Sequence, residues 1–264
     1  MIPKKIHYCW FGRNPKPKLA EKCIKSWKKH CPDYEIIEWN EDNYDLDSAP
    51  LYVRQAYEAR KWAFVTDYVR LQVVYEQGGI YMDTDVELIK PLDMLLQHCA
   101  YFGFEGDASI ATGLGFGAEK GTHILKEMMD DYQDIPFLQE DGAYDTTTCP
   151  NRNTAVFLKH HLVQDGSRQV LEGDILILPS IYLCPIEFDT KTRRYSQDTI
   201  SIHWFDASWQ TEEARTECTE FAKQQRKKLL VIRIKAAAKR MLGDDVYLGI
   251  KKLLKRGEQG NAHN

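Results

Sequence analysis

Gly78-Gly79-Ile80-Tyr81-Met82-Asp83-Thr84-Asp85 is the stretch that decides the fold. A Gly-Gly break introduces a short apolar strand, and two carboxylates separated by one residue follow it. Side chains at i and i+2 of an extended strand point the same way, so Asp83 and Asp85 can converge on one hard cation. Oxygen ligands of this kind suit Mg²⁺ or Mn²⁺. Ile80 and Met82 predict a buried strand whose acidic end emerges at a sheet edge, where α/β folds bind ligands.

The segment 61–78, just before this strand, predicts a helix that the glycines end. Its apolar residues recur near a 3.6-residue spacing: Phe64, Leu71, Val74 and Tyr75. Asp67 and Arg70 lie three residues apart on one face of this helix. On a solvated surface such a pair would contribute only about 0.2–0.5 kcal/mol. Apolar neighbours surround it here, which favours a role beside Asp83 and Asp85.

Three segments of the chain resemble a known family. The series 63–70 followed by 75–85 is similar to the core of the DXD-containing sugar transferases. These include bacterial capsular-polysaccharide and lipopolysaccharide glycosyltransferases, fungal initiating mannosyltransferases and, more distantly, the large glucosylating toxins. Residues 2–12 resemble the first strand of the bacterial members, and residues 202–209 resemble their closing motif. The resemblance covers about residues 1–210 and implies a GT-A type α/β fold, with a Rossmann-like mixed sheet flanked by helices.

The resemblance also implies a nucleotide-sugar donor, a divalent metal (Mn²⁺ or Mg²⁺) and retention of the anomeric configuration. Asp85 is the expected direct metal ligand. Asp83 is expected to contact ribose or sugar hydroxyls and the waters of the metal, and His203 matches the position of a second protein ligand. A core histidine with satisfied hydrogen bonds is the alternative for His203, which ends an apolar strand. Asp67 and Arg70 would hold the hydroxyls of the donor sugar.

Further donor contacts follow from the same resemblance. Ser208 and Trp209 would donate hydrogen bonds to the diphosphate, and Trp10 would stack near the nucleobase. A core role is the alternative for Trp10. Tyr81 could face the donor, although its place in a strand favours the core. UDP is the favoured nucleotide on the resemblance alone.

The acceptor is expected to be a saccharide, free or lipid-linked, in surface polysaccharide synthesis. Where many relatives have Thr-Gly-Pro, this chain has residues 146–151 (TTTCPN), so acceptor contacts stay unassigned. A protein acceptor, or a catalytically silent sugar- or metal-binding relative, is the alternative. A glycosidase is disfavoured because it needs two carboxylates on opposite sides of the scissile bond. The glycine-rich segment 111–118 lacks the order of a phosphate-binding loop and more simply brings backbone close to a sugar or turns a strand.

Composition agrees with one catalytic domain over residues 1–210. The chain has 264 residues, of which 43% are hydrophobic, enough for one sizeable core. Its seven cysteines are odd in number and form no C-x-x-C pair, which predicts neither a zinc site nor a disulfide framework and favours a reducing cytosol. The N-terminal residues lack the apolar run of a leader or anchor, so a cytoplasmic enzyme is expected.

Residues 211–264 predict a basic, amphipathic helical tail. Residues 222–257 contain twelve Lys or Arg and two Asp, a net charge of +10; the whole chain carries −4, so the rest carries −14. Apolar residues interleave with these bases. The tail could pack on the core as a solvated helical pair, or lie on an anionic inner membrane leaflet, which would make the enzyme peripheral there. The acidic remainder disfavours nucleic acid as a partner.

Alternating strands and helices are expected along the whole catalytic domain. The expected strands are 5–10, 35–39, the strand before Asp83, 86–89, 100–105, 175–178 and 199–204. The expected helices are 15–31, 49–61, 63–76, a short one after Pro91, 123–132 and 154–161.

Overall fold

The structure, a computed structural model, describes residues 1–206. The helices are α1 (Lys18–His30), α2 (Leu51–Glu58), α3 (Trp62–Gln77), α4 (His123–Asp130), α5 (Cys149–Lys159) and α6 (Ser180–Leu183), with 3₁₀ turns η1 (Asp93–Leu95) and η2 (Thr112–Leu114). The strands are β1 (Lys5–Cys9), β2 (Glu35–Trp39), β3 (Gly79–Tyr81), β4 (Val86–Leu88), β5 (Ala100–Glu105), β6 (Ser109–Ile110), β7 (Phe116–Ala118), β8 (Gln169–Leu171), β9 (Ile175–Leu178) and β10 (Ser201–His203).

One mixed sheet forms the centre of the fold, in the order β2-β1-β3-β7-β5-β9-β8, with β6 paired to β5. β1 runs parallel to both β2 and β3, whereas β7 is antiparallel to its neighbours β3 and β5. The carboxyl ends of β1 and β3 therefore meet at the same edge of the sheet. The predicted fold class, a Rossmann-like mixed sheet of the GT-A type flanked by helices, is confirmed.

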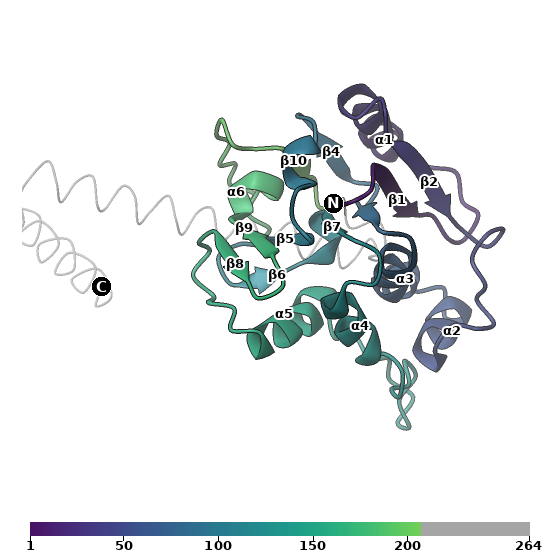
Figure 1. Cartoon of the computed structure of the whole chain (residues 1–264). Coiled ribbons are helices and arrows are strands. Elements are labelled where there is room, and N and C mark those ends of the chain that lie inside the picture. Colours follow the sequence, from purple (N-terminus) through teal and green to yellow (C-terminus); the bar gives the residue numbers. More distant parts are fainter. Residues whose placement is uncertain (207–264) are drawn as a thin grey trace, which may run out of the picture. The chain divides into compact units, whose positions relative to one another are not determined.

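Helices cover both faces of the sheet, because its strands are apolar on both sides (Figure 1). In β9, Ile175 and Ile177 join the core formed with α2, α3, α4 and α5, and Leu176 and Leu178 join the core formed with α1, α6 and β4. This alternation is the two-residue period of a strand. β3 shows it too, since Tyr81 faces the first core and its neighbours face the second.

β4 and β10 form a separate two-stranded antiparallel sheet, in which Val86 pairs with His203. The sequence predicted both strands but not that they pair in a sheet of their own. α1 packs against the β4 strand of this small sheet. The indole N–H of Trp27 donates to the Val86 carbonyl at 2.8 Å, and the Leu88 N–H donates to Ser26 Oγ at 2.9 Å.

Most expected elements lie within a few residues of their predicted bounds. α5 is the main exception, because it begins at Cys149, five residues before the expected start. Pro150 lies in its first turn, where a missing N–H costs nothing, so the proline starts this helix instead of breaking it. The strands β6, β7 and β8 and the helix α6 were not expected. No helix among the described residues is long and apolar enough to cross a membrane.

Candidate functional site

Asp83 and Asp85 lie in the turn that follows β3, not in the strand itself. The Val86 N–H donates to the Asp83 carbonyl at 3.0 Å and closes this turn. The expected extended conformation is therefore wrong, although the expected convergence is confirmed. One carboxylate oxygen of each aspartate and one ring nitrogen of His203 all lie within 4.8 Å of one another.

Asp85 is fixed by groups from the end of β10 and the residues after it. Its Oδ1 lies 3.3 Å from His203 Nε2, and its Oδ2 accepts a hydrogen bond from the Asp206 N–H at 2.9 Å. The Trp204 N–H donates to the Asp85 carbonyl at 3.0 Å. Residues about 120 positions apart in sequence thus hold one carboxylate in place.

Arg70 lies beneath these carboxylates, on the inner side of α3. Its Nη2 is 3.1 Å from Asp67 Oδ1 and 3.4 Å from Asp83 Oδ1. The side chain of Arg70 is 4% exposed and that of Asp67 is 10% exposed, whereas Asp83 is 29% exposed. The pair is therefore not a solvated surface ion pair, and Asp83 is the member of this group that reaches solvent most.

The charges of this cluster perturb one another because little water screens them. Burial raises the pKa of Asp67 to about 6, although Arg70 opposes the rise. Burial also raises the pKa of Asp83, again against Arg70. For Asp85, burial acts in the same direction, but the charge and hydrogen bond of His203 outweigh it, and the pKa falls below its usual value. Asp85 is thus the carboxylate most firmly ionised at neutral pH.

The family comparison covers this part of the chain. Residues 17–101, from the residue before α1 to the start of β5, match the family described as "Glycosyltransferase sugar-binding region containing DXD motif". The match includes Asp67, Arg70, Asp83 and Asp85. Residues 17–101 of this chain are therefore similar to a glycosyltransferase sugar-binding region.

Known relatives of the sugar-binding region share part of their length with this chain. Over 136 residues the chain is 29% identical to inositol phosphoceramide mannosyltransferase 3 of Schizosaccharomyces pombe. The alignment covers 48% of this chain and 36% of that protein. Over 163 residues it is 24% identical to the subversion of eukaryotic traffic protein A of Legionella pneumophila, covering 49% of this chain and 24% of that protein. The chain thus spans about a third or less of the length of these relatives. Among solved structures, the PaToxG glycosyltransferase aligns with a TM-score of 0.46 and 19% identity, over 60% of this chain and 68% of its own.

Residues outside 17–101 pack against Arg70 and Asp83, and the sequence assigned none of them to the site. Cys149, at the start of α5, lies with its Sγ 3.3 Å from Thr112 Oγ1 and 3.9 Å from Arg70 Nη1. The side-chain amide of Asn153 donates to both Thr112 Oγ1 and Cys149 Sγ. Gly113 lies directly against Asp83, because a Cβ on this glycine would be 2.4 Å from Asp83 Oδ2. Two signals in the sequence pointed here: the departure from Thr-Gly-Pro at residues 146–151 and the glycine-rich segment 111–118.

The structure places the remaining predicted residues as follows. Tyr81 is buried with its hydroxyl donating to Asp83 Oδ1 at 2.9 Å, so it faces the carboxylate cluster and not solvent. Trp10 follows β1 at the same sheet edge, with its indole N–H donating to the Asn14 carbonyl at 2.7 Å. No contact joins Trp10 to the cluster within residues 1–206. Ser208 and Trp209 lie outside the described residues, and so does the predicted tail 211–264.

The residues around Asp85 fit a divalent cation. Two carboxylates and an imidazole present their ligand atoms to one point, and carboxylate oxygens are the donors that Mg²⁺ and Mn²⁺ prefer. His203 Nε2 faces Asp85 Oδ1 at 3.3 Å, and His203 Nδ1 is buried with no hydrogen-bond partner among residues 1–206. The protonated form of His203 is favoured by Asp85 here, despite the opposing effect of burial on its pKa. A cation would take the place of that proton.

Proposed function

We propose that this chain is a metal-dependent, retaining glycosyltransferase. It would move a sugar from a nucleotide-sugar, with a UDP-sugar favoured, to a saccharide acceptor in surface polysaccharide synthesis. The convergence of Asp83, Asp85 and His203 behind β3 carries this proposal, because it presents one cation-binding point at the edge of the sheet. The family match over residues 17–101 supports the same activity.

The chain's own groups divide the work between holding the cation and holding the donor. Asp85 and His203 would ligate Mn²⁺ or Mg²⁺, with Asp83 beside them. When bound, this cation supplies the positive charge that neutralises a leaving diphosphate. Arg70 has its N–H groups engaged by Thr66, Asp67 and Asp83. Arg70 therefore positions the carboxylates. We also propose that Asp67 and Arg70 contact hydroxyls of the donor sugar.

A glycosidase fits this geometry less well. The ligand oxygens of Asp83 and Asp85 lie within 4.8 Å of each other on one turn. Hydrolysis of a glycoside requires carboxyl groups on either side of the bond, about 5–9.5 Å apart. Retention by attack from the face of the leaving group needs no carboxylate nucleophile, so none is assigned.

The acceptor is the less constrained half of the reaction. One relative is named a mannosyltransferase of inositol phosphoceramide and another a protein that subverts eukaryotic traffic. A lipid-linked saccharide in the cytoplasm at the inner membrane is the proposed acceptor. A protein acceptor is the alternative, and so is a silent relative that binds donor without turnover.

Donor use is tested first with the soluble substrate. The full chain is incubated with UDP-, GDP-, CDP- and dTDP-sugars with Mn²⁺, and release of the nucleoside diphosphate is followed. Asp85→Asn keeps an acceptor for the Asp206 N–H but removes the charge, and Asp85→Ala removes both. Either change should abolish nearly all Mn²⁺-dependent release and most UDP binding. Release that survives both substitutions and EDTA would contradict the assignment, and donor binding without turnover in the wild type would favour the silent relative.

A further inference from the structure

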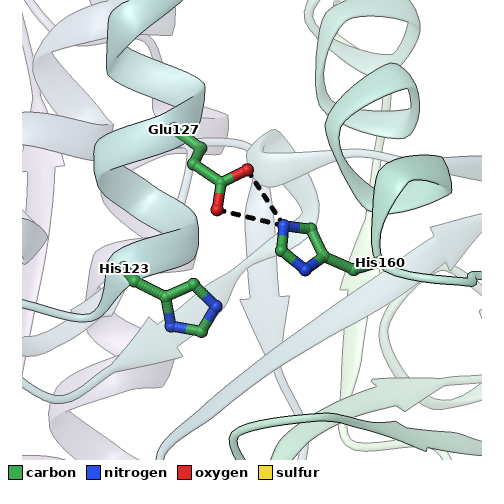
Figure 2. Close-up of side chains that lie close together, drawn as sticks. All are labelled: His123, Glu127 and His160. Atoms are coloured by element: carbon green, nitrogen blue, oxygen red, sulfur yellow. Dashed lines mark hydrogen bonds and ion pairs between the residues drawn. The ribbon is translucent and has the colours of Figure 1, made fainter.

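A second group of metal-binding side chains lies far from Asp85 in the sequence, on α4 and at the end of α5. His123 is the first residue of α4, and Glu127 lies one turn later on the same face. His160 is the residue that ends α5. Figure 2 shows the three side chains pointing toward one another from the two helices.

The distances between these groups suit a shared ion. One ligand atom from each of the three residues lies within 4.8 Å of the others. His160 Nε2 is 3.1 Å from Glu127 Oε1 and 2.9 Å from Glu127 Oε2. The rings of His123 and His160 have centroids 5.6 Å apart and lie edge to face. His123 is exposed, and the other two residues are partly buried, so an ion can reach the group from solvent.

A plain ion pair between Glu127 and His160 does not require His123. His98 and Asp174 show such a pair elsewhere on this chain, with His98 Nδ1 2.8 Å from Asp174 Oδ1. Among the described residues, that pair has no third ligand group near it, whereas the pair on α4 and α5 does. His123 lies in the first turn of α4 and is exposed, and its ring lies edge to face with that of His160.

The geometry points to a zinc site formed by His123, Glu127 and His160. Two imidazoles and one carboxylate are a donor set for Zn²⁺, which in such three-ligand sites keeps a fourth position for water or another ligand. Nitrogen donors favour Zn²⁺ over Mg²⁺ and Mn²⁺, so this site and the oxygen-rich site at Asp85 select different cations. Coordination would replace the hydrogen bond between His160 and Glu127 with two metal–ligand bonds.

His160 also lines a surface cavity of about 440 Å³, together with Lys159, His161, Gln169 and Glu172, among others, so this histidine can be reached from solvent.

The zinc would join the N-terminal turn of α4 to the C-terminal end of α5. α5 begins at Cys149, whose thiol contacts Thr112 and Arg70. A zinc ion that joins the C-terminal end of α5 to α4 would stabilise the folded chain, because it binds the native arrangement and not the unfolded one.

Zinc binding is measured by calorimetric titration of the full chain with Zn²⁺ alone. The titrations use a parent that carries Asp83→Asn and Asp85→Asn, so that the first site does not contribute. We expect one ion per chain. His123→Ala or His160→Gln in this parent should weaken binding by at least about tenfold, a loss seen even for residues that only support a ligand. His98→Gln is the matched control and should leave binding unchanged.

Thermal unfolding gives a second readout. Zn²⁺ should raise the Tm of the parent and of His98→Gln, and not that of His160→Gln. His160→Gln keeps a hydrogen-bonding side chain toward Glu127, so a folded protein without zinc binding is the expected state. No binding by the parent would overturn the zinc site, as would binding that survives both His123→Ala and His160→Gln, or an equal loss in His98→Gln.

Discussion

At the scale of single residues, the guanidinium of Arg70 supplies the positive charge that stabilises Asp67 and Asp83 beside each other. It lies between Asp67 and Asp83, and its own side chain is 4% exposed. Two carboxylates close together in a site with little water repel each other, and the cation between them offsets that repulsion. A lysine at this position would supply the charge without the planar fork that reaches Thr66 as well.

Arg70→Ala should therefore unfold the protein more easily. Removing one partner of a buried ion pair costs about 3–5 kcal/mol, because the remaining charge is left uncompensated. Arg70→Lys should lose less stability, and both variants should lose turnover. Urea denaturation measures the first effect and diphosphate release the second. The matched control is Arg13→Ala, since the Arg13–Asp42 pair is 63% and 69% exposed and should contribute little to stability. Equal stability losses in Arg70→Ala and Arg13→Ala would contradict this account.

Gly113→Ala should damage the site without unfolding the chain. The new methyl group would lie 2.4 Å from Asp83 Oδ2 and 3.2 Å from Arg70 Nη1, so the Asp83 carboxylate must move. We expect a higher Mn²⁺ requirement and slower donor turnover, measured by titrating Mn²⁺ in the release assay. Gly103→Ala is the control, because its methyl group would meet Leu183 at 2.9 Å, in the core. A control variant that loses Mn²⁺ affinity as strongly as Gly113→Ala would show that general crowding is the cause.

At the scale of elements, the cation site depends on a small sheet that the main sheet does not contain. β10 carries His203, and within residues 1–206 it pairs only with β4. β4 in turn rests on α1 through the hydrogen bonds of Trp27 and Ser26. The position of His203 is thus set by a helix that has no residue in the site.

Ser26→Ala tests this support. The Leu88 N–H would be left buried without its acceptor, which costs about 1–3 kcal/mol. We expect lower stability in urea and weaker Mn²⁺ binding, because the strand next to β10 is loosened. Ser48→Ala also removes a hydroxyl that bonds a backbone carbonyl, but on an exposed turn, and should change stability by less than about 0.5 kcal/mol. Unchanged Mn²⁺ binding in a destabilised Ser26→Ala protein would mean that α1 supports the fold alone.

The sequence predicted elements well where one local pattern decides them. The apolar spacing and the glycine stop gave α3 within one residue at each end. Prediction failed at the turn of Asp83 and Asp85, because side-chain alternation does not report the local backbone hydrogen bond that closes it. It also failed where distant residues decide. Cys149 contacts Arg70, which lies 79 positions away in the sequence, and no local sequence pattern predicts such a contact.

At the scale of the whole molecule, charge is divided between the two predicted parts of the chain. Residues 222–257 carry +10, and the remainder carries −14. A lipid-linked acceptor would lie at an anionic surface that repels the acidic part and attracts the basic one. We propose that residues 211–264 hold the enzyme there, and these residues lie outside the described structure.

Charge reversal in the tail tests that proposal. The positions are Lys227, Lys228, Lys239 and Arg240. Loss of each base should weaken binding to anionic vesicles by about 1 kcal/mol, and reversal to Glu should weaken it further. Release of diphosphate from the soluble donor should be preserved, because the residues proposed to bind the donor all lie before residue 211. Lys25→Glu and Lys28→Glu, on the exposed side of α1, are the controls and should leave vesicle binding nearly unchanged. Cosedimentation with vesicles of anionic and of neutral lipid, at low and high salt, measures these effects. Binding that is absent in the wild type, or that ignores both salt and the tail substitutions, would assign the tail to packing on the core.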